Sequence, residues 1–566
     1  MISNCLDLSL SAQEASSSDS CTLRGFYPKR EERIQLSKAF DEMYVELIPQ
    51  LAKGFNAYHG EERSDRYWEV LIGPFLKRYL RVMMNRALTL EQTLQNSSIC
   101  RVHLDTKPAH YVAQNTLSFI ELVDLHQFSE RVYFDLAKDF YPDLQIEFSE
   151  NNESDQKKLS LGSDAGNESQ SSKKQDISRV LLFIQSLFSG GKVYIHDMYA
   201  SKKLKLLSHV LNGQFPRLVK RSVPLQVSEV EERQNFMPIQ CVSSSRRIFH
   251  AAIEKYFFRH VPRCFVEDYK ELVSSESYAQ FPSSPKIIVT STAFDTDEYF
   301  KAWLADQLEH NAQYIVLQHG AVYGTNPFFQ ETVEERTSDS FLTWGWAKAP
   351  NHKKTFCFNT AYDHLDWKRE SEALLFVQII KRRNKFIWDT EIEYASYMND
   401  QIEFVENLDK SMQENVIVRL YRAYKRRCPN QKSLLQSASS YLKFDEGERD
   451  FQELVRESRL VLFAYESSGF LELLSLDFPV IAFWDNEGFD QHHNDLDQFY
   501  SLLVDAKILH KSGESAAKFV NYVWDDVDEW WGSESVVEAR NQFVEQFAAK
   551  TKSPASNLNK ILREHH

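Results

Sequence analysis

The residue best suited to acid–base chemistry is His319, which directly follows the apolar run YIVLQ and precedes Gly320. A histidine on a tight turn at a strand end faces the ligand cleft of a parallel sheet, and an imidazole with an ordinary pKa near 6.5 can take a proton from a hydroxyl at neutral pH. A structural histidine that hydrogen-bonds its own loop is the alternative. We take His319 as a candidate general base, with Gln318, Gly320 and Tyr323 beside it on the acceptor side.

Carboxylates follow the preceding apolar run, KIIVTST at residues 286–292. The segment AFDTDEYF places Asp295, Asp297 and Glu298 at the end of this predicted strand and the start of the next helix. Carboxylates in a first helical turn stabilise the helix dipole, so helix capping accounts for at least one of them. A carboxylate that faces His319 could orient the imidazole or act on the substrate. Asp297 and Glu298 are the candidates for that role.

A phosphate site is predicted after the apolar run LVLFAY, residues 460–465. Glu466, Ser467, Ser468 and Gly469 begin a helix there, where unpaired N–H groups and two hydroxyls meet the positive end of the helix dipole. Such a helix start suits a phosphate or diphosphate. An ordinary serine cap on a buried helix is the alternative.

Two further residues extend the predicted donor site. Glu472 lies one turn into the same helix and could accept hydrogen bonds from a ribose, although a lone glutamate is more often a solvated charge. Arg419, in NVIVRLYRAYKRR, ends a neighbouring strand and could bring a cation to the same phosphate.

Several nucleotide and metal motifs are absent from the sequence. It has no GxGxxG after the first strand of either predicted domain, and no GxxxxGK[ST], GxSxG or HExxH. The loop FWDNEGFDQHHND carries Asp485, Asp490, His492 and His493 without a recognised metal-ligand spacing, so we expect no metal site. The remaining possibility is phosphate binding at a helix start between two domains. This is the chemistry of a nucleotide-activated donor substrate, and no cofactor is expected.

The elements that would position these residues alternate between strand-like and helical runs, as in parallel sheets covered by helices. Residues 179–362 are predicted to form a first, acceptor-side Rossmann-like domain. Residues 363–412 are interpreted as a helical connection, and residues 413–566 as a nucleotide-donor domain with C-terminal helices. Two doubly wound α/β domains that face each other bind ligands between the carboxyl ends of their strands.

The N-terminal part has a different pattern. Residues 29–148 repeat apolar residues at spacings of three and four, which predicts a helical region. Residues 1–28 are serine-rich and predicted to be a disordered arm. Residues 149–178 contain too few apolar side chains to offset the entropy of ordering, and are predicted to be a disordered insertion.

Composition excludes other classes of protein. The 566 residues are 43% hydrophobic with a net charge of −15, so the chain can bury cores, and nucleic acid is not an expected partner. Seven scattered cysteines without a CxxC pair suit a reducing compartment. The N-terminus lacks a secretory signal, and charges interrupt the most apolar stretch, residues 460–484. We expect a cytoplasmic protein, with peripheral membrane contact left open.

The chain resembles the transferase family first noted in leptospiral surface-polysaccharide gene clusters. The resemblance runs from about residue 40 to residue 548, without the predicted insertion. It rests on the order and spacing of five segments, which are DRYWEVLIGPFL (65–76), QHGAVYG (318–324), SDSFLTWGW (338–346), YESSGFLELLSLDFPVIAFWD (465–485) and VWDDVDEWW (523–531).

The HG pair and the tyrosine, acidic residue and two serines before a helix are also similar to CDP-glycerol glycerophosphotransferases and capsule Kdo transferases, which have GT-B-like folds. This resemblance implies His319 as the base, Ser467 and Ser468 on the donor phosphate, and a CMP- or CDP-linked donor. In those enzymes the arginine motif continues to a His-Pro or Tyr-Pro pair, whereas Arg422 follows RLY here.

Together these features predict a metal-independent glycosyltransferase of GT-B-like architecture. It would move a sugar, of the Kdo or another nonulosonic type, from a CMP-linked donor to a surface polysaccharide or lipopolysaccharide. Its partners would be a nucleotide sugar and a glycan or lipid-linked glycan acceptor, with contact to the inner membrane or to other polysaccharide enzymes left open. A polyol-phosphate transferase, a nucleotide-sugar epimerase and a non-catalytic scaffold are the alternatives.

Overall fold

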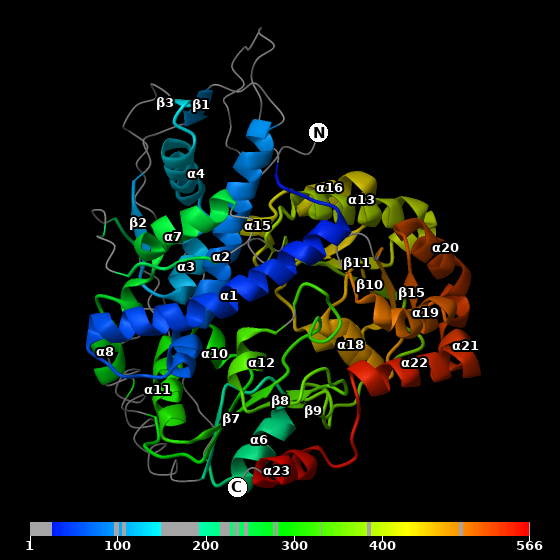
Figure 1. Ribbon diagram of the computed structural model, residues 1–566. Coiled ribbons are helices and arrows are strands. Elements are labelled where there is room, and N and C mark those ends of the chain that lie inside the picture. The colour runs from blue at the N-terminus through cyan, green and yellow to red at the C-terminus, as the bar shows by residue number, and fades with distance from the viewer. Residues whose placement is uncertain are drawn as a thin grey trace, which may run out of the picture.

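The computed structural model describes residues 25–95, 101–104, 109–148, 192–214, 227–229, 233, 237–242, 247–275, 278, 281–329, 331–381, 386–485 and 491–564. The predicted insertion, residues 149–178, lies outside the described residues, as do residues 1–24 of the predicted arm. Figure 1 shows two α/β units side by side, with the N-terminal helices lying across them.

Five parallel strands form the first sheet, in the order β4-β6-β7-β8-β9. Their bounds are Val193–His196, Ile287–Thr290, Gln313–Leu317, Ser340–Thr343 and His352–Lys354. Strands β4, β6 and β8 are buried at every position, as expected where helices cover both faces of a parallel sheet. Helices α6 (Lys202–Leu211), α10 (Ala293–Thr296), α11 (Glu298–Glu309) and α12 (Val333–Thr337) follow strands of this sheet.

Six parallel strands form the second sheet, in the order β12-β11-β10-β13-β14-β15. Their bounds are Lys443–Asp445, Val416–Arg419, Ala373–Val377, Ser458–Phe463, Val480–Phe483 and Leu509–His510. Two parallel sheets with a helical N-terminal region confirm the predicted α/β class and GT-B-like arrangement. The second sheet is doubly wound, because its strand order reverses between β10 and β13, whereas the described strands of the first sheet lie side by side in chain order. Helices α15 (Tyr424–Arg427), α16 (Gln431–Ala438), α17 (Phe451–Arg456) and α18 (Ser468–Ser475) also belong to this part of the chain.

The helical connection predicted for residues 363–412 is wrong in its first half. Strand β10 lies within it and pairs with β11 on one side and β13 on the other, so it is a central strand. Its apolar run ALLFV is short and lies between charged segments, so the sequence pattern indicated a helix here instead of a strand. In the described part of this segment, helix is found in the second half, in α13 (Glu391–Asn407) and α14 (Lys410–Gln413).

Two long helices, α1 (Arg30–His59) and α2 (Asp65–Gln95), dominate the N-terminal region. They are joined by α3 (Thr116–Leu122), α4 (His126–Phe140), α7 (Ile248–His260) and α8 (Tyr269–Ser274), and by the short strands β1 (Arg101–Leu104), β2 (Tyr111–Ala113), β3 (Gln145–Phe148) and β5 (Val227–Glu229). Helix α2 packs against α11 and α12 of the first sheet. Helix α1 is tied to α13 by a buried ion pair, Arg33 to Glu393 at 2.7 Å. The N-terminal region therefore touches both α/β units.

The last four residues of the predicted N-terminal arm, 25–28, pack against this region. Phe26 is buried, and its backbone N–H donates to Thr89 Oγ1 at 3.3 Å. The arm prediction is wrong for these residues because an aromatic side chain finds a place against α2.

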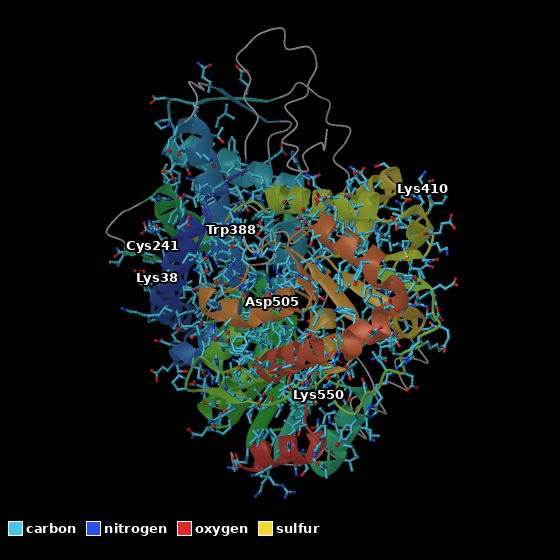
Figure 2. All side chains as sticks on the ribbon, turned by 90° about the vertical axis from the view of Figure 1, so that its right-hand side faces the viewer. Lys38, Cys241, Trp388, Lys410, Asp505 and Lys550 are labelled. Atoms are coloured by element: carbon cyan, nitrogen blue, oxygen red, sulfur yellow. The ribbon has the colours of Figure 1, made fainter. Side chains whose placement is uncertain are left out.

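The C-terminal helices are α19 (Asp497–Asp505), α20 (Gly513–Val523), α21 (Val527–Gly532), α22 (Glu534–Phe547) and α23 (Pro554–Glu564). After α22 the chain passes Lys550 and returns to the first sheet, where α23 packs against α6 (Figures 1 and 2). Gly345 permits this crossing: its φ is 133°, and a Cβ there would lie 2.5 Å from the Glu545 carbonyl oxygen. The predicted donor domain, 413–566, thus sends its last helix to the other sheet. Among the described residues, no helix is long and apolar enough to cross a membrane.

Candidate functional site

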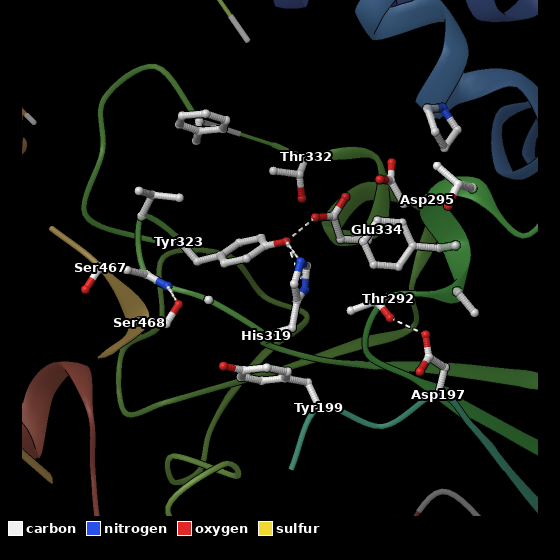
Figure 3. Close-up of a pocket in the computed structure, with 18 of the residues that line it drawn as sticks. Asp197, Tyr199, Thr292, Asp295, His319, Tyr323, Thr332, Glu334, Ser467 and Ser468 are labelled. Carbon is white, nitrogen blue, oxygen red and sulfur yellow. Dashed lines mark hydrogen bonds between the residues drawn. The ribbon is translucent and has the colours of Figure 1, made fainter. Parts of the chain in front are cut away.

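A cavity of about 1560 Å³ lies between the carboxyl ends of the two sheets. Its lining includes the loops that follow β4, β6 and β7 in the first sheet, the turn between β13 and α18 in the second, and helix α2. Residues of α3, α6, α12 and α17 and of the segments after β10 and β11 complete it. Figure 3 shows His319 and Tyr323 between Ser467 and Ser468 on one side and Asp295 and Glu334 on the other.

The loop after β7 is held in place by Gln318. Its side-chain N–H donates to the Gly320 carbonyl at 2.9 Å, and its Oε1 accepts from Trp344 N at 2.8 Å and Trp346 Nε1 at 2.9 Å. Gln318 is only 1% exposed and does not line the cavity. A direct acceptor contact, predicted for Gln318, does not fit this burial; the residue instead fixes the turn that presents His319.

His319 lies beside a short chain of hydrogen-bonding side chains. The Tyr323 hydroxyl lies 3.3 Å from His319 Nδ1 and donates to Glu334 Oε1 at 2.5 Å (Figure 3). Burial and the neighbouring carboxylate raise the pKa of Tyr323, so the hydroxyl stays protonated. Burial also raises the pKa of Glu334, while the hydrogen bond from Tyr323 opposes that shift. Glu334 is thus linked to the imidazole through Tyr323.

Sequence reasoning missed Glu334, although a signal was present. The segment TVEE is a capping box in which Thr332 and Glu335 cap each other's backbone N–H groups. This cap begins α12 and leaves Glu334, in its first turn, directed at Tyr323.

The two predicted partner carboxylates of His319 are placed differently. Asp297 lines the cavity but caps α11, since it accepts from Phe300 N at 3.0 Å, and it lies 3.4 Å from His196 Nε2. Glu298 is 2% exposed, forms an ion pair with Lys301 at 2.7 Å, and does not line the cavity. The role proposed for Glu298 at the substrate does not fit this geometry.

Asp295 is another carboxylate of the cavity lining. Arg78 of α2 forms an ion pair with it at 2.7 Å. Burial disfavours the charged form, but Arg78 together with Lys301 and His319 outweighs burial, and the pKa of Asp295 is lowered. Asp295 is therefore a carboxylate at neutral pH.

The start of α18 forms the opposite wall. Ser467 is the helix cap and accepts from Phe470 N at 3.0 Å, while Ser468 Oγ accepts from Ala321 N at 3.0 Å (Figure 3). The second contact joins the His319 loop directly to α18. Gly469 packs against a ring, because a Cβ there would lie 3.1 Å from Phe463. On the facing loop, a Cβ on Gly320 would be in ordinary contact with Ser468 Oγ.

Two acidic residues flank the serines. Glu466 is 4% exposed and accepts from the Tyr500 hydroxyl at 2.7 Å and from Thr325 Oγ1 at 3.3 Å. Glu472 accepts from the Tyr199 hydroxyl at 2.9 Å, and burial raises its pKa to about 7. Both residues line the cavity.

Arg419 does not reach this wall. It forms an ion pair with Asp445 on the neighbouring strand, and it is not part of the cavity lining. The predicted phosphate contact therefore does not fit Arg419, whose guanidinium is used within the sheet.

The loop with metal-ligand residue types shows ordinary contacts where it is described. His492 Nε2 lies 2.9 Å from Asp497, and Asp490 is outside the described residues. Within the described ranges, no group of three His, Cys, Asp or Glu is placed to hold a metal ion.

The contribution of α2 to the cavity lining was not foreseen. Lys77, Arg78 and Arg81 line the cavity from this helix. The spacing of basic residues in FLKRYLRV is visible in the sequence, but this helix was interpreted as part of a separate region. Packing of α2 against α11 and α12 brings it to the site.

A comparison with protein families finds that the LIC12162 family transferase matches residues 4–562. The chain belongs to this family. The match covers nearly the whole sequence, so the resemblance to a transferase family is confirmed and the protein is a transferase by family. No curated protein matches the sequence significantly.

Similar solved structures include a UDP-N-acetylglucosamine 2-epimerase, with 13% identity over 66% of this chain and 96% of that one and a TM-score of 0.36. Another is the spinosyn rhamnosyltransferase SpnG complexed with spinosyn aglycone, with 12% identity, coverage of 52% and 76%, and a TM-score of 0.29. A third is WaaG, a glycosyltransferase involved in lipopolysaccharide biosynthesis, with 12% identity, coverage of 52% and 95%, and a TM-score of 0.27. These activities are properties of those proteins.

Proposed function

We propose that the protein is a glycosyltransferase that uses a nucleotide-activated sugar. One observation carries the proposal: the start of α18 and the His319 loop, from different sheets, line one cavity and are joined by a hydrogen bond from Ala321 N to Ser468 Oγ at 3.0 Å. A donor phosphate at the helix start would thereby lie opposite a histidine base. Membership of a transferase family supports group transfer as the reaction class.

The donor phosphate is assigned to Ser467, Ser468 and the first N–H groups of α18. Each hydroxyl accepts a backbone hydrogen bond, so its own O–H proton is directed elsewhere and can be donated to a phosphate oxygen. The helix dipole adds favourable positive potential at the same point. Glu472, on the next turn of α18, is assigned to the ribose.

The proposed reaction transfers one glycosyl group. The acceptor hydroxyl oxygen forms a bond to the anomeric carbon, while the bond from that carbon to the phosphate oxygen breaks and its electrons leave with the nucleotide. His319 takes the hydroxyl proton, and Tyr323 with Glu334 holds the imidazole at the cavity wall. Asp297, which also lines the cavity, is the second candidate for contact with the sugar.

We further propose a CMP-linked donor of the Kdo or another nonulosonic type, and a surface polysaccharide or lipopolysaccharide acceptor. The similarity of the HG and YESS segments to enzymes that release cytidine nucleotides supports this choice. The reaction is placed in the cytoplasm, where nucleotide sugars are substrates, with peripheral contact at the inner membrane when the acceptor is lipid-linked.

The test is nucleotide binding followed by transfer. CMP, CDP, UDP and GDP are titrated in thermal-shift experiments, where a ligand at a hundredfold its Kd stabilises the fold by about 2.7 kcal/mol. We expect CMP to bind wild type, Ser468→Ala to weaken binding, and Ser437→Ala, an exposed serine of α16, to leave it unchanged. His319→Ala should keep CMP binding and lose transfer.

Three other results would redirect the proposal. If no nucleotide changes the melting temperature, the donor site is wrong and the scaffold alternative is favoured. Release of free nucleotide without an acceptor would indicate an epimerase. Transfer of glycerol phosphate from CDP-glycerol, with no transfer of sugar, would indicate a polyol-phosphate transferase.

A further inference from the structure

Helix α2 brings three cations to the end of the cavity that lies away from α18. Lys77 and Arg81 are four residues apart and therefore share one face of the helix, with Arg78 beside them. All three line the cavity. Strand ends normally supply the polar groups of such a cleft, so a basic wall from an N-terminal helix is an additional feature.

Two of these cations are already compensated. Lys77 Nζ donates to the Glu331 carbonyl at 2.6 Å and lies 3.4 Å from Asp41 Oδ1. Arg78 forms its ion pair with Asp295 at 2.7 Å. Their charges are used to hold α2 against α1, α10 and the segment before α12.

Arg81 differs from them. Within the described part of the chain, its guanidinium makes no hydrogen bond and no ion pair, and it lies over the rings of Phe40 and Phe329 at 5.1 and 5.9 Å. Burial lowers the pKa of Arg81 to about 10, which still leaves it charged at neutral pH. A partly desolvated cation held between aromatic rings gains strongly from an oxyanion, because the guanidinium can bind two oxygens at once.

The position of Arg81 separates it from the donor site. Arg81 lies one turn of α2 from Arg78, which pairs with Asp295, and over the ring of Phe329, so it belongs to the Asp295 and Glu334 end of the cavity. The nearby carboxylates Asp41 and Glu334 favour its charged form, and Arg78 opposes it. Figure 3 shows this end on the far side of Tyr323 from Ser467 and Ser468. A group bound at Arg81 therefore belongs to a different part of the substrates from the phosphate bound at α18.

We propose that Arg81 binds an oxyanion, a carboxylate or a phosphate, on the acceptor glycan. The assignment to the acceptor rests on the proposed function, which puts the donor phosphate at α18. Arg81 then selects acidic or phosphorylated acceptors and directs their hydroxyl toward His319.

Three sugars test this site by titration at constant ionic strength: glucuronate for a carboxylate, glucose 6-phosphate for a phosphate, and glucose as the neutral probe. We expect wild type to bind at least one anionic sugar more tightly than glucose. The Kd of the Arg81→Gln variant for that anionic sugar should be about tenfold to a hundredfold higher than the Kd of wild type, as expected for the loss of a charge-assisted hydrogen bond. Arg81→Lys should recover part of the loss, because it keeps the charge without the two-pronged geometry.

Lys38→Gln is the matched control, since it removes one positive charge from α1 at a side chain that is 79% exposed and outside the cavity lining. It should bind all three sugars like wild type. The unliganded melting temperatures of the variants report whether the fold is kept, and Arg81→Lys provides the comparison if Arg81→Gln unfolds.

The proposal is overturned if wild type binds neither anionic sugar more tightly than glucose, or if both Arg81 variants bind them as wild type does. CMP titration of the same variants separates it from the donor proposal. If CMP does not bind wild type but the anionic sugar still depends on Arg81, the oxyanion site stands and the donor site fails. If CMP binding alone depends on Arg81, the cation serves the donor and the acceptor assignment is wrong.

Discussion

The Tyr199 hydroxyl donates a hydrogen bond to the Glu472 carboxylate at 2.9 Å, and so connects the loop after β4 in the first sheet to helix α18 of the second. Burial is the main reason that the pKa of Glu472 rises from 4.5 to about 7, and hydrogen bonds from Tyr199 and Asn359 only partly oppose it. The contact between the two α/β units therefore includes a group that changes charge near neutral pH.

Stability should fall as the pH rises through this range. Between pH 4.5 and 7 the folded protein keeps the Glu472 proton while the unfolded chain has lost it, so unfolding becomes easier with rising pH, by up to about 3 kcal/mol in total. Glu472→Gln removes this dependence. The measurement is the urea midpoint of wild type and Glu472→Gln between pH 5 and 8.

The difference between the pH dependence of the urea midpoint in wild type and in Glu472→Gln separates the contribution of Glu472 from that of other titrating groups. Glu453→Gln is the control, because its side chain on α17 is 56% exposed and should leave the slope of wild type intact. Parallel curves for wild type and Glu472→Gln would contradict the prediction.

Tyr323→Phe should destabilise the protein. It leaves the buried Glu334 without the hydroxyl that donates to it, which costs about 1 to 3 kcal/mol. Tyr314→Phe is a matched control, since the Tyr314 hydroxyl on β7 is buried with no hydrogen-bond partner among the residues that the structure describes, and its removal should be neutral or stabilising. Thermal melts of both variants test this prediction. Equal decreases in melting temperature would mean that the hydrogen bond of the Tyr323 hydroxyl contributes nothing specific to stability.

Ser467→Ala should affect both stability and nucleotide binding. Loss of the helix cap costs about 1 kcal/mol, and the same cost is expected for Ser512→Ala, which removes the cap of α20 outside the cavity lining. Only Ser467→Ala should weaken CMP binding in titrations. If the two variants bind CMP equally, Ser467 acts as a cap alone.

The strand ends could be predicted because local pattern determines them. Apolar runs that stop at His319 or at Ser467 and Ser468 show where a buried strand gives way to a turn, and all three residues line the cavity. The contact between these turns, from Ala321 N to Ser468 Oγ, depends on how the two sheets pack. No local sequence pattern indicates it.

The errors have the same origin. Arg419 ends a strand as predicted, but its guanidinium forms an ion pair with Asp445 on the adjacent strand. This pairing follows from the sheet order β12-β11-β10, which the sequence alone does not indicate. The place of Arg81 in the cavity lining depends on the packing of α2 against the first sheet, which no local sequence pattern indicates. Sequence patterns identify elements and their ends, but tertiary packing decides which polar groups remain available to a ligand.

Glu298→Gln should destabilise the fold without changing the site. Glu298 pairs with Lys301 at 2.7 Å, both are at most 2% exposed, and Glu298 Oε1 accepts from Thr116 N at 2.8 Å. Removing one charge leaves the other buried and unpaired, at a cost of about 3 to 5 kcal/mol.

Replacing both partners, Glu298→Met with Lys301→Met, should recover most of that loss, because no buried charge is left. Asp297→Asn, the adjacent control, should stay close to wild type in stability since asparagine caps helices equally well. Urea midpoints of the four proteins test this order. CMP affinity should be unchanged in Glu298→Gln under conditions where it is folded, whereas a loss of CMP binding there would return Glu298 to the substrate site.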